Sequence, residues 1–90
     1  MYRIKPYSVR QANKIGVKIR PSTKTGKKID VFKNGVKVAS IGQRGYLDYP
    51  SYIEKYGLLI ANKRRKLYHI RHKQNKVPGT PGYYAAKILW

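Results

Sequence analysis

The clearest pattern of alternating apolar and polar positions occupies residues 28–41. Residues 28–33 and 36–41 each alternate, and Asn34-Gly35 separates the two runs. Asn and Gly tolerate the positive φ angles of a two-residue turn, so the pattern predicts a β-hairpin that turns at these positions. The expected cross-strand pairs are Lys33 with Val36, Val31 with Val38, and Ile29 with Ser40.

The segment before the hairpin combines a helical pattern with a short extended one. Apolar residues recur at helical spacing between Ser8, a candidate N-cap, and Gly16, a candidate C-terminal stop, which predicts a short helix. Residues 17–20 alternate apolar and basic side chains and predict a brief extended segment. Residues 21–27 predict a basic, flexible loop.

A second short helix is predicted over residues 46–57. Pro50 suits a first helical turn, and Ser51 and Glu54 have the spacing of a capping box. Gly57 is expected to end this helix.

The longest predicted helix follows, from Leu58 to about Gln74. Its apolar residues Ile60, Leu67 and Ile70 form one stripe. A second stripe is basic and contains Arg65, Lys66, His69, His72 and Lys73. A turn-rich connector over residues 76–82 then leads to a last, strongly apolar helix over residues 83–90.

These elements predict the α+β class: one small domain in which a β-hairpin packs against three or four short helices. A hairpin is marginally stable alone, so a helix must cover one of its faces. The 90 residues leave room for a single domain, with a basic N-terminal segment at 1–27 and the hairpin and remaining helices at 28–90. The longest apolar run has four residues, and the N-terminus lacks the apolar stretch of a secretory signal, so we expect neither a membrane span nor export.

The net charge of the chain is the feature that says most about its partners. Lys and Arg number 21 against three acidic residues, which gives a formal net charge of +18. Self-repulsion of this size opposes the compact state, and binding to a polyanion relieves it. Nucleic acid is the commonest such partner, an acidic protein surface comes second, and an anionic membrane is a distant third. A hydrophobic fraction of 41% and an aromatic fraction of 12% argue against a disordered basic tail.

The densest cluster of basic residues is the segment 63–73, which holds six permanent positive charges, two His and no acid. A solvated basic face is the ordinary interpretation, but no acidic residue is interleaved for i,i+4 pairing, which favours polyanion contact. On a helix, Arg65, Lys66, His69 and Lys73 are expected to face one way. The candidate polyanion- or partner-binding residues are Lys63, Arg64, Arg65, Lys66, His69, Arg71, His72 and Lys73, together with Lys24 and Lys27 in the loop before the hairpin.

Histidine and tyrosine residues allow more specific interpretations. His69 and His72 have metal-ligand spacing, but carboxylates to complete a site are scarce, so solvated or partner-facing histidines are expected. Tyr49, Tyr52 and Tyr56 recur at helical spacing, which fits base stacking and a core-facing stripe, with the core favoured. The remaining aromatic cluster, Tyr83, Tyr84 and Trp90, is expected to close the core under the long helix or to anchor a partner protein.

The sequence contains few residues that could support catalysis. Metal-assisted phosphodiester hydrolysis needs clustered carboxylates, and the three acids are spread along the sequence. The chain has no Cys, and no Ser lies in a recognisable nucleophile elbow. Gly42 and Gly45 lack the Lys-Ser/Thr of a phosphate-binding loop and predict a turn. We therefore expect no enzymatic activity, no catalytic residue, no metal and no cofactor.

Four further segments are distinctive: KIDVFKNGVKVASIG at 28–42, DYPSY at 48–52, RRKLYxxRH at 64–72 and GTPGYYAAKILW at 79–90. Together they resemble a small uncharacterised basic domain family of large eukaryotic DNA viruses of the phycodnavirus, mimivirus and marseillevirus type. The resemblance covers roughly residues 14–90 and is most specific in the arginine-histidine and C-terminal segments. No activity is established for that family, so the resemblance implies a setting: a viral protein, located in the virion and, during assembly, in the host cytoplasm or nucleus.

Three functions fit these observations. The first, ranked slightly ahead on the viral resemblance, is a virion structural protein, a minor capsid or internal component that binds acidic surfaces of capsid or other virion proteins within a multi-protein assembly. The second, favoured by the charge, is a nucleic-acid-binding protein that coats or packages the viral genome. The third is a small accessory subunit of a nucleic-acid enzyme.

Overall fold

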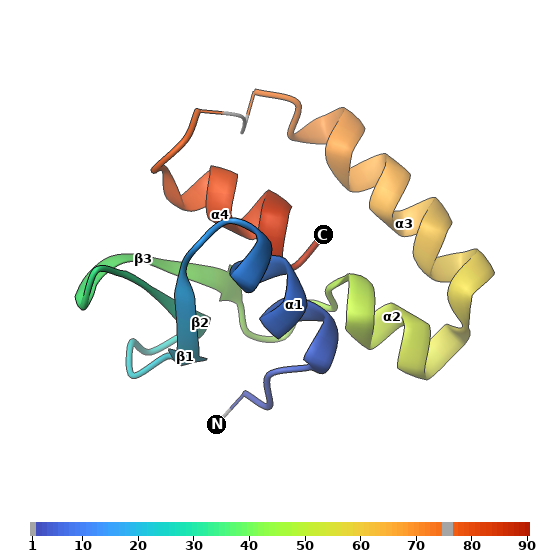
Figure 1. Cartoon of the computed structure of the whole chain (residues 1–90). Coiled ribbons are helices and arrows are strands. Elements are labelled where there is room, and N and C mark those ends of the chain that lie inside the picture. Colours follow the sequence, from blue (N-terminus) through green and yellow to red (C-terminus); the bar gives the residue numbers. More distant parts are fainter. Residues whose placement is uncertain (1, 75–76) are drawn as a thin grey trace.

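The computed structural model describes residues 2–74 and 77–90 and has the predicted α+β class (Figure 1). A three-stranded antiparallel sheet is combined with four helices. The elements are α1 (Pro6–Lys14), β1 (Lys18–Pro21), β2 (Lys27–Lys33), β3 (Val36–Gln43), α2 (Tyr49–Tyr56), α3 (Leu58–Arg71) and α4 (Pro81–Ile88).

The predicted hairpin is formed by β2 and β3. Asn34 and Gly35 have φ angles of 53° and 78°, as the two-residue turn requires. Lys33 pairs with Val36 as expected. The other two predicted pairs were wrong, because an irregularity at Val31/Phe32 shifts the register by one residue. The observed partners are Val31 with Ala39 and Ile29 with Ile41.

A third strand, β1, completes the sheet. The extended segment predicted at 17–20 pairs with β2 in the order β1-β2-β3, with Ile19 opposite Val31. Lys27, expected in a loop, is instead the first residue of β2 and lies opposite Gln43.

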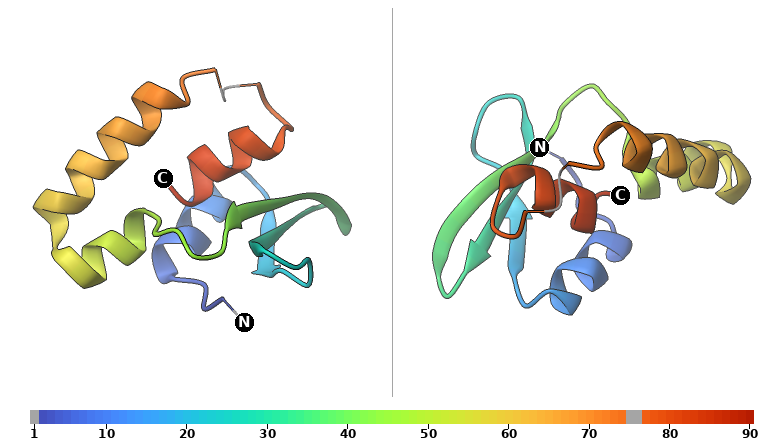
Figure 2. Two further views of the ribbon diagram at one scale, coloured as in Figure 1. Left: turned by 180° about the vertical axis from the view of Figure 1, so that it is seen from behind. Right: turned by 90° about the horizontal axis from the view of Figure 1, so that it is seen from above.

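Helices α1 and α4 cover the sheet and enclose the core. Contacts join α4 to β3, α1 to β1, and the two helices to each other. Figure 2 shows both helices between the sheet and the α2–α3 pair. The largest fully buried apolar side chains are Ile29, Val31, Ile41, Ile88 and Leu89.

Two predicted helix caps were wrong. Helix α1 begins at Pro6 after Lys5, so Ser8 is buried within the first turn rather than capping it. Helix α2 begins at Tyr49, and its cap is Asp48, which accepts a hydrogen bond from the backbone N–H of Ser51. A carboxylate suits this position because the first N–H groups of a helix have no partner within the helix.

Helices α2 and α3 form a helical hairpin around Gly57, which has a φ of 89°. Helix α3 ends at Arg71, three residues before the predicted end. Its buried residue is Ala61, and the helix contacts α2. The expectation of buried tyrosines holds for Tyr49 and is wrong for Tyr56, which is 53% exposed.

The last helix begins earlier than predicted. Thr80 caps α4 through a hydrogen bond that its hydroxyl accepts from the N–H of Tyr83. Part of the predicted 76–82 connector, residue 76, lies outside the described residues. Tyr84 is buried as expected, whereas Tyr83 and Trp90 are half-buried at the edge of the core.

Candidate polyanion-binding site

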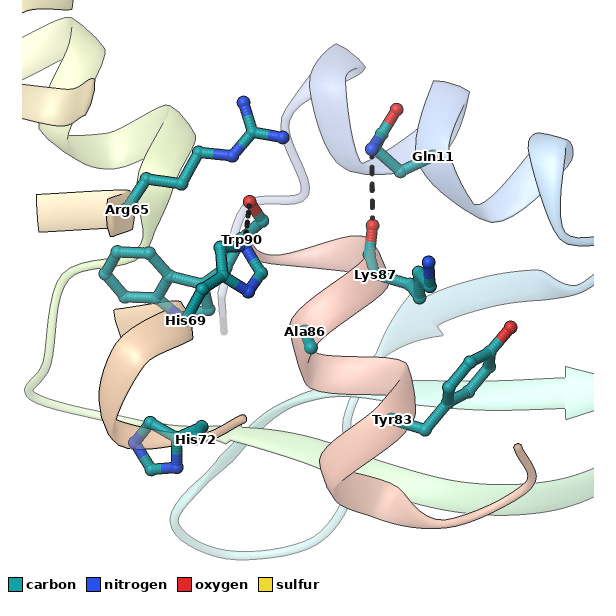
Figure 3. A pocket seen from close by; sticks show the side chains of 8 residues that line it. All are labelled: Gln11, Arg65, His69, His72, Tyr83, Ala86, Lys87 and Trp90. Atoms are coloured by element: carbon teal, nitrogen blue, oxygen red, sulfur yellow. Dashed lines mark hydrogen bonds between the residues drawn. The ribbon is translucent and has the colours of Figure 1, made fainter. Parts of the chain in front are cut away.

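A cleft of about 370 Å³ opens between α1, α3 and α4 (Figure 3). Arg65, His69 and His72 reach it from α3 and the residue that follows, and Lys87 reaches it from α4. No acidic side chain lines it. Its lining residues are Gln11, Arg65, His69, His72, Tyr83, Ala86, Lys87 and Trp90. The combination of cations and flat rings can bind a phosphate or carboxylate and stack against a planar group.

Arg65 is held in place on the wall of this cleft. Its guanidinium carbon lies 4.9 Å from the centre of the Tyr49 ring, a cation–π arrangement. The Tyr49 hydroxyl donates a hydrogen bond of 2.8 Å to Oδ1 of Asn62 on α3, which fixes the ring. Arg65 is half-buried, so its stem packs while its donors remain available at the cleft.

An aromatic stack borders the cleft through His72 and Trp90. The rings of Tyr68 and Trp90 are nearly parallel, with centroids 4.5 Å apart and an interplanar angle of 6°. His72 stacks with Tyr68 at 4.3 Å. His69 Nε2 lies 3.3 Å from the carbonyl oxygen of Trp90 (Figure 3). The stack therefore joins the C-terminal end of α3 to Trp90, the residue that follows Leu89 after α4.

A second cleft of about 450 Å³ shares His72, Tyr68 and Trp90 with the stack. Lys27, Lys28 and Arg71 also line it, together with the carboxylate of Asp48. Two clefts that are rich in basic residues thus meet at one set of aromatic rings.

The acidic side chains are all engaged within the fold. Asp30 is 3% exposed and accepts hydrogen bonds from the hydroxyls of Ser22 and Ser40, at 2.6 and 2.7 Å. Burial opposes ionisation of Asp30, but these hydrogen bonds outweigh it and hold its pKa below the ordinary value. On the surface, Glu54 pairs with Lys5, at 2.5 Å between Oε2 and Nζ.

Asp48 is the most constrained of the three. Its Oδ2 accepts a hydrogen bond of 2.6 Å from the Tyr2 hydroxyl and lies 3.0 Å from Nζ of Lys28. Burial opposes its ionisation, yet the hydrogen bonds from Tyr2 and the N–H of Ser51, with the charge of Lys28, lower its pKa. Burial, and then the bond to Asp48, raise the pKa of Tyr2.

The surface that remains is strongly cationic. Among the described basic residues only Lys28 is buried, whereas two of the three acidic side chains are buried. In the part of the chain that the structure describes, no group of three or more His, Cys, Asp or Glu could hold a metal ion. Likewise, no described helix has the length and apolar character needed to cross a membrane.

The predicted binding residues fall into three groups. Arg65, His69 and His72 line the first cleft, and Lys27, Arg71 and His72 line the second. Exposed positions outside both clefts are Lys24, Lys63, Arg64, Lys66 and Lys73.

Sequence reasoning missed some of the first cleft's residues. Gln11 and Lys87 lie on helices far apart in the chain, and the Gln11 side chain donates a hydrogen bond to the Lys87 carbonyl. Lys87 lies one helical turn after Tyr83, with Nζ 5.8 Å from the ring centre, and this i,i+4 spacing was the available signal.

Comparison with known protein families gives a match over part of the chain. Residues 17–51 are similar to a family of unknown function (DUF5754). The match spans the three strands and the beginning of α2, including Lys28 and Asp48, and covers fewer than half of the residues. Neither curated proteins nor solved structures include a significant match to the chain.

Proposed function

We propose that this protein is a non-catalytic, cationic component of an assembly, and that it binds acidic surfaces of larger proteins. The observation that carries this proposal is the distribution of charge. Asp30 and Asp48 are buried and bonded to groups inside the fold, and Glu54 is paired with Lys5. The basic surface therefore has few internal partners, and an external polyanion lowers its self-repulsion.

The setting we propose is the virion of a large DNA virus, in which the protein is a minor capsid or internal component. The sequence resemblance supports this setting, and a strongly cationic protein of this size fits between acidic surfaces of larger subunits. The proposed locations are the virion and, during assembly, the host cytoplasm or nucleus.

Nucleic acid is the second candidate partner, and the first cleft favours it. Arg65 and Lys87 supply charge for a phosphate, and the Tyr68–Trp90 stack offers a ring edge beside them. Single-stranded nucleic acid is bound by this combination of basic groups and aromatic rings. In this alternative, the protein coats or packages the viral genome.

The decisive experiment separates purified particles of the encoding virus into shell and genome-containing core, and follows the protein with an antibody. Under the first proposal, the protein remains with the shell after nuclease treatment. Recovery with the core, and release by nuclease, would select the nucleic-acid alternative. Absence from particles would reject both virion assignments.

A further inference from the structure

The outward face of α3 is apolar, although the helix is already packed on its other side. Leu59, Leu67 and Ile70 are 72%, 49% and 57% exposed, and Ile60 is 39% exposed. Monomeric proteins seldom leave several large aliphatic side chains exposed on one helix face without a partner.

The inward face of α3 is occupied by different residues. Ala61 is fully buried, Tyr68 stacks on Trp90, and the Arg65 guanidinium lies over the Tyr49 ring of α2. Figure 2 shows α3 at the edge of the molecule farthest from the sheet, so its other side faces outwards. The stripe therefore lies outside the core cluster, with Leu67 at its edge beside a hollow that Tyr52 and Trp90 also line.

The outward residues follow the spacing of a coiled-coil seam. Ile60, Lys63, Leu67 and Ile70 are separated by three, four and three residues, as are successive a and d positions of a heptad. Lys63 is exposed and occupies one position of this seam. A single polar residue in such a seam selects the partner and its register.

Basic residues flank the seam on both sides. With Ile60 and Leu67 at a positions, the e and g positions within α3 are Arg64, Lys66 and Arg71, and a leucine, Leu59, while Lys73 lies just beyond the end of the helix. Side chains at e and g decide partner choice through charge pairing. A second copy of this helix would place Lys opposite Lys or Arg along both flanks, which costs free energy for each like-charge pair.

We propose that the outward face of α3, the α3 seam (Ile60, Lys63, Leu67 and Ile70), docks one amphipathic helix of an acidic partner protein. The partner helix has aliphatic residues at its contact positions, Asp or Glu on both flanks, and a carboxylate facing Lys63. The inference rests on the proposed function and specifies its partner: the charge recruits the acidic surface, and the seam fixes where it binds. With 14 residues, α3 is about 21 Å long and presents two heptads to such a helix.

The test uses a synthetic peptide of about three heptads, long enough to be helical, with Leu at a and d, Glu at e and g, and one central Glu in the seam. Binding to the full chain is measured by fluorescence anisotropy of the labelled peptide. We expect saturable binding with increased peptide helicity. A peptide of identical composition with its heptad order scrambled keeps the charge but should bind at least about tenfold more weakly.

Matched variants distinguish binding at the α3 seam from nonspecific hydrophobic or electrostatic binding elsewhere on the surface. The double substitution Leu67→Asn and Ile70→Asn should weaken binding about tenfold or more. The control pair Val36→Asn and Val77→Asn also removes two exposed aliphatic side chains, 63% and 61% exposed, and should leave affinity within about twofold. Circular dichroism verifies that both variants are folded.

A charge swap tests the register. Lys63→Glu should weaken binding of the peptide with the central Glu, and a peptide with Lys at that position should restore it. Equal binding of ordered and scrambled peptides, or no effect of the seam substitutions, overturns the inference. In that case, shell location and binding to acidic proteins would still support the proposed function, so the two failures can be told apart.

Two other occupants of the seam are outcomes of the same experiments. Self-association that Leu67→Asn and Ile70→Asn abolish, measured by analytical ultracentrifugation, would replace the acidic helix with a second copy. Tight binding to phosphatidylserine vesicles that the same substitutions abolish, with no peptide binding, would replace it with a membrane surface. Either result overturns the proposal.

Discussion

Lys28 and Asp48 form a buried ion pair that joins β2 to the start of α2, with 3.0 Å between Nζ and Oδ2. Their side chains are 6% and 1% exposed. Nζ of Lys28 also donates to the carbonyl of Tyr46, and the Tyr2 hydroxyl donates to Asp48. The pair thus connects the sheet, the N-terminal segment and the helical hairpin, and it uses one of the chain's few carboxylates for structure.

Asp48→Ala is expected to destabilise the fold by about 3 kcal/mol or more, because it leaves the buried ammonium of Lys28 without its counter-ion and removes the cap of α2. Urea denaturation followed by circular dichroism measures the change. The matched control is Glu54→Gln, which breaks the exposed pair with Lys5 and should cost less than about 1 kcal/mol. Similar losses for the two variants would contradict a structural role of the buried pair.

Acid should destabilise the protein below about pH 4. The pKa values of Asp30 and Asp48 are lower in the folded chain than the ordinary value of 3.8. Each carboxylate therefore stabilises the fold at pH values above its unfolded pKa, and this contribution is lost as the pH falls through the folded pKa. Urea midpoints measured at half-unit intervals from pH 6 to pH 2 should decline most steeply from pH 4 downwards. Asp48→Asn should show a shallower decline, and an unchanged profile would argue against the assigned contribution of Asp48.

Gly35→Val should destabilise the protein by about 1–2 kcal/mol, since a β-branched residue resists the φ of 78° at this turn. An added Cβ at Gly35 meets no atom within 4 Å, so backbone strain, rather than a clash, causes the effect. Gly35→Asn is the control, because Asn adopts this conformation more readily. The prediction fails if both variants have the same thermal midpoint as the unmodified protein.

Charge reversal on α3 should weaken polyanion binding more than reversal near the sheet. Lys66 and Lys73 are exposed in or just after α3, whereas Lys24 and Lys33 are exposed in the β1–β2 loop and at the end of β2. Arg65 is avoided because it packs on the Tyr49 ring, so reversing it would disturb the fold as well. Glu at both positions of each pair changes the net charge equally. The difference is measured as the affinity of each variant for polyglutamate at several salt concentrations. Equal losses would mean that the net charge, and not α3, controls binding.

Trp90 provides a test of nucleic-acid binding in the first cleft. It is the chain's single tryptophan, it lines the cleft, and it stacks on Tyr68. A single-stranded oligonucleotide that stacks there should quench its fluorescence, with an affinity that falls steeply as salt increases. Polyglutamate, which has no bases, serves as the control and should quench much less. Oligonucleotide binding without quenching would place the nucleic acid elsewhere on the basic surface.

The α3 seam shows where sequence patterns stop being informative. Periodicity identified Ile60, Leu67 and Ile70 as one stripe, but any helix in a small domain has two sides that compete for the core. Here Ala61 is buried and Tyr68 stacks on Trp90, so these residues take the inner side of α3 and the aliphatic stripe is left largely exposed. Such a choice depends on the shapes of neighbouring elements, which no local pattern contains.

Local chemistry was sufficient for much of the rest. Asn34-Gly35 determined the hairpin turn, because few other residues adopt its φ angles, and the helices followed from apolar spacing. The excess of Lys and Arg, and the absence of Cys, are properties of the sequence alone. The hairpin register beyond the first pair did not follow from the turn, because an irregularity at Val31/Phe32 shifts the pairing by one residue and the alternating pattern does not reveal it.

The tertiary structure alone decided what the charged residues do. In the sequence, Asp48 is one acid among many bases. Folding brings Lys28 and Tyr2 to it from 20 and 46 residues away, and it becomes a buried link. The first cleft likewise assembles Gln11, Arg65 and Lys87 from three helices. Contacts between residues this distant in the chain are set by how the helices pack on the sheet. The sequence therefore determined the cationic character of this protein, and the fold decided which charged groups are buried and which line the clefts.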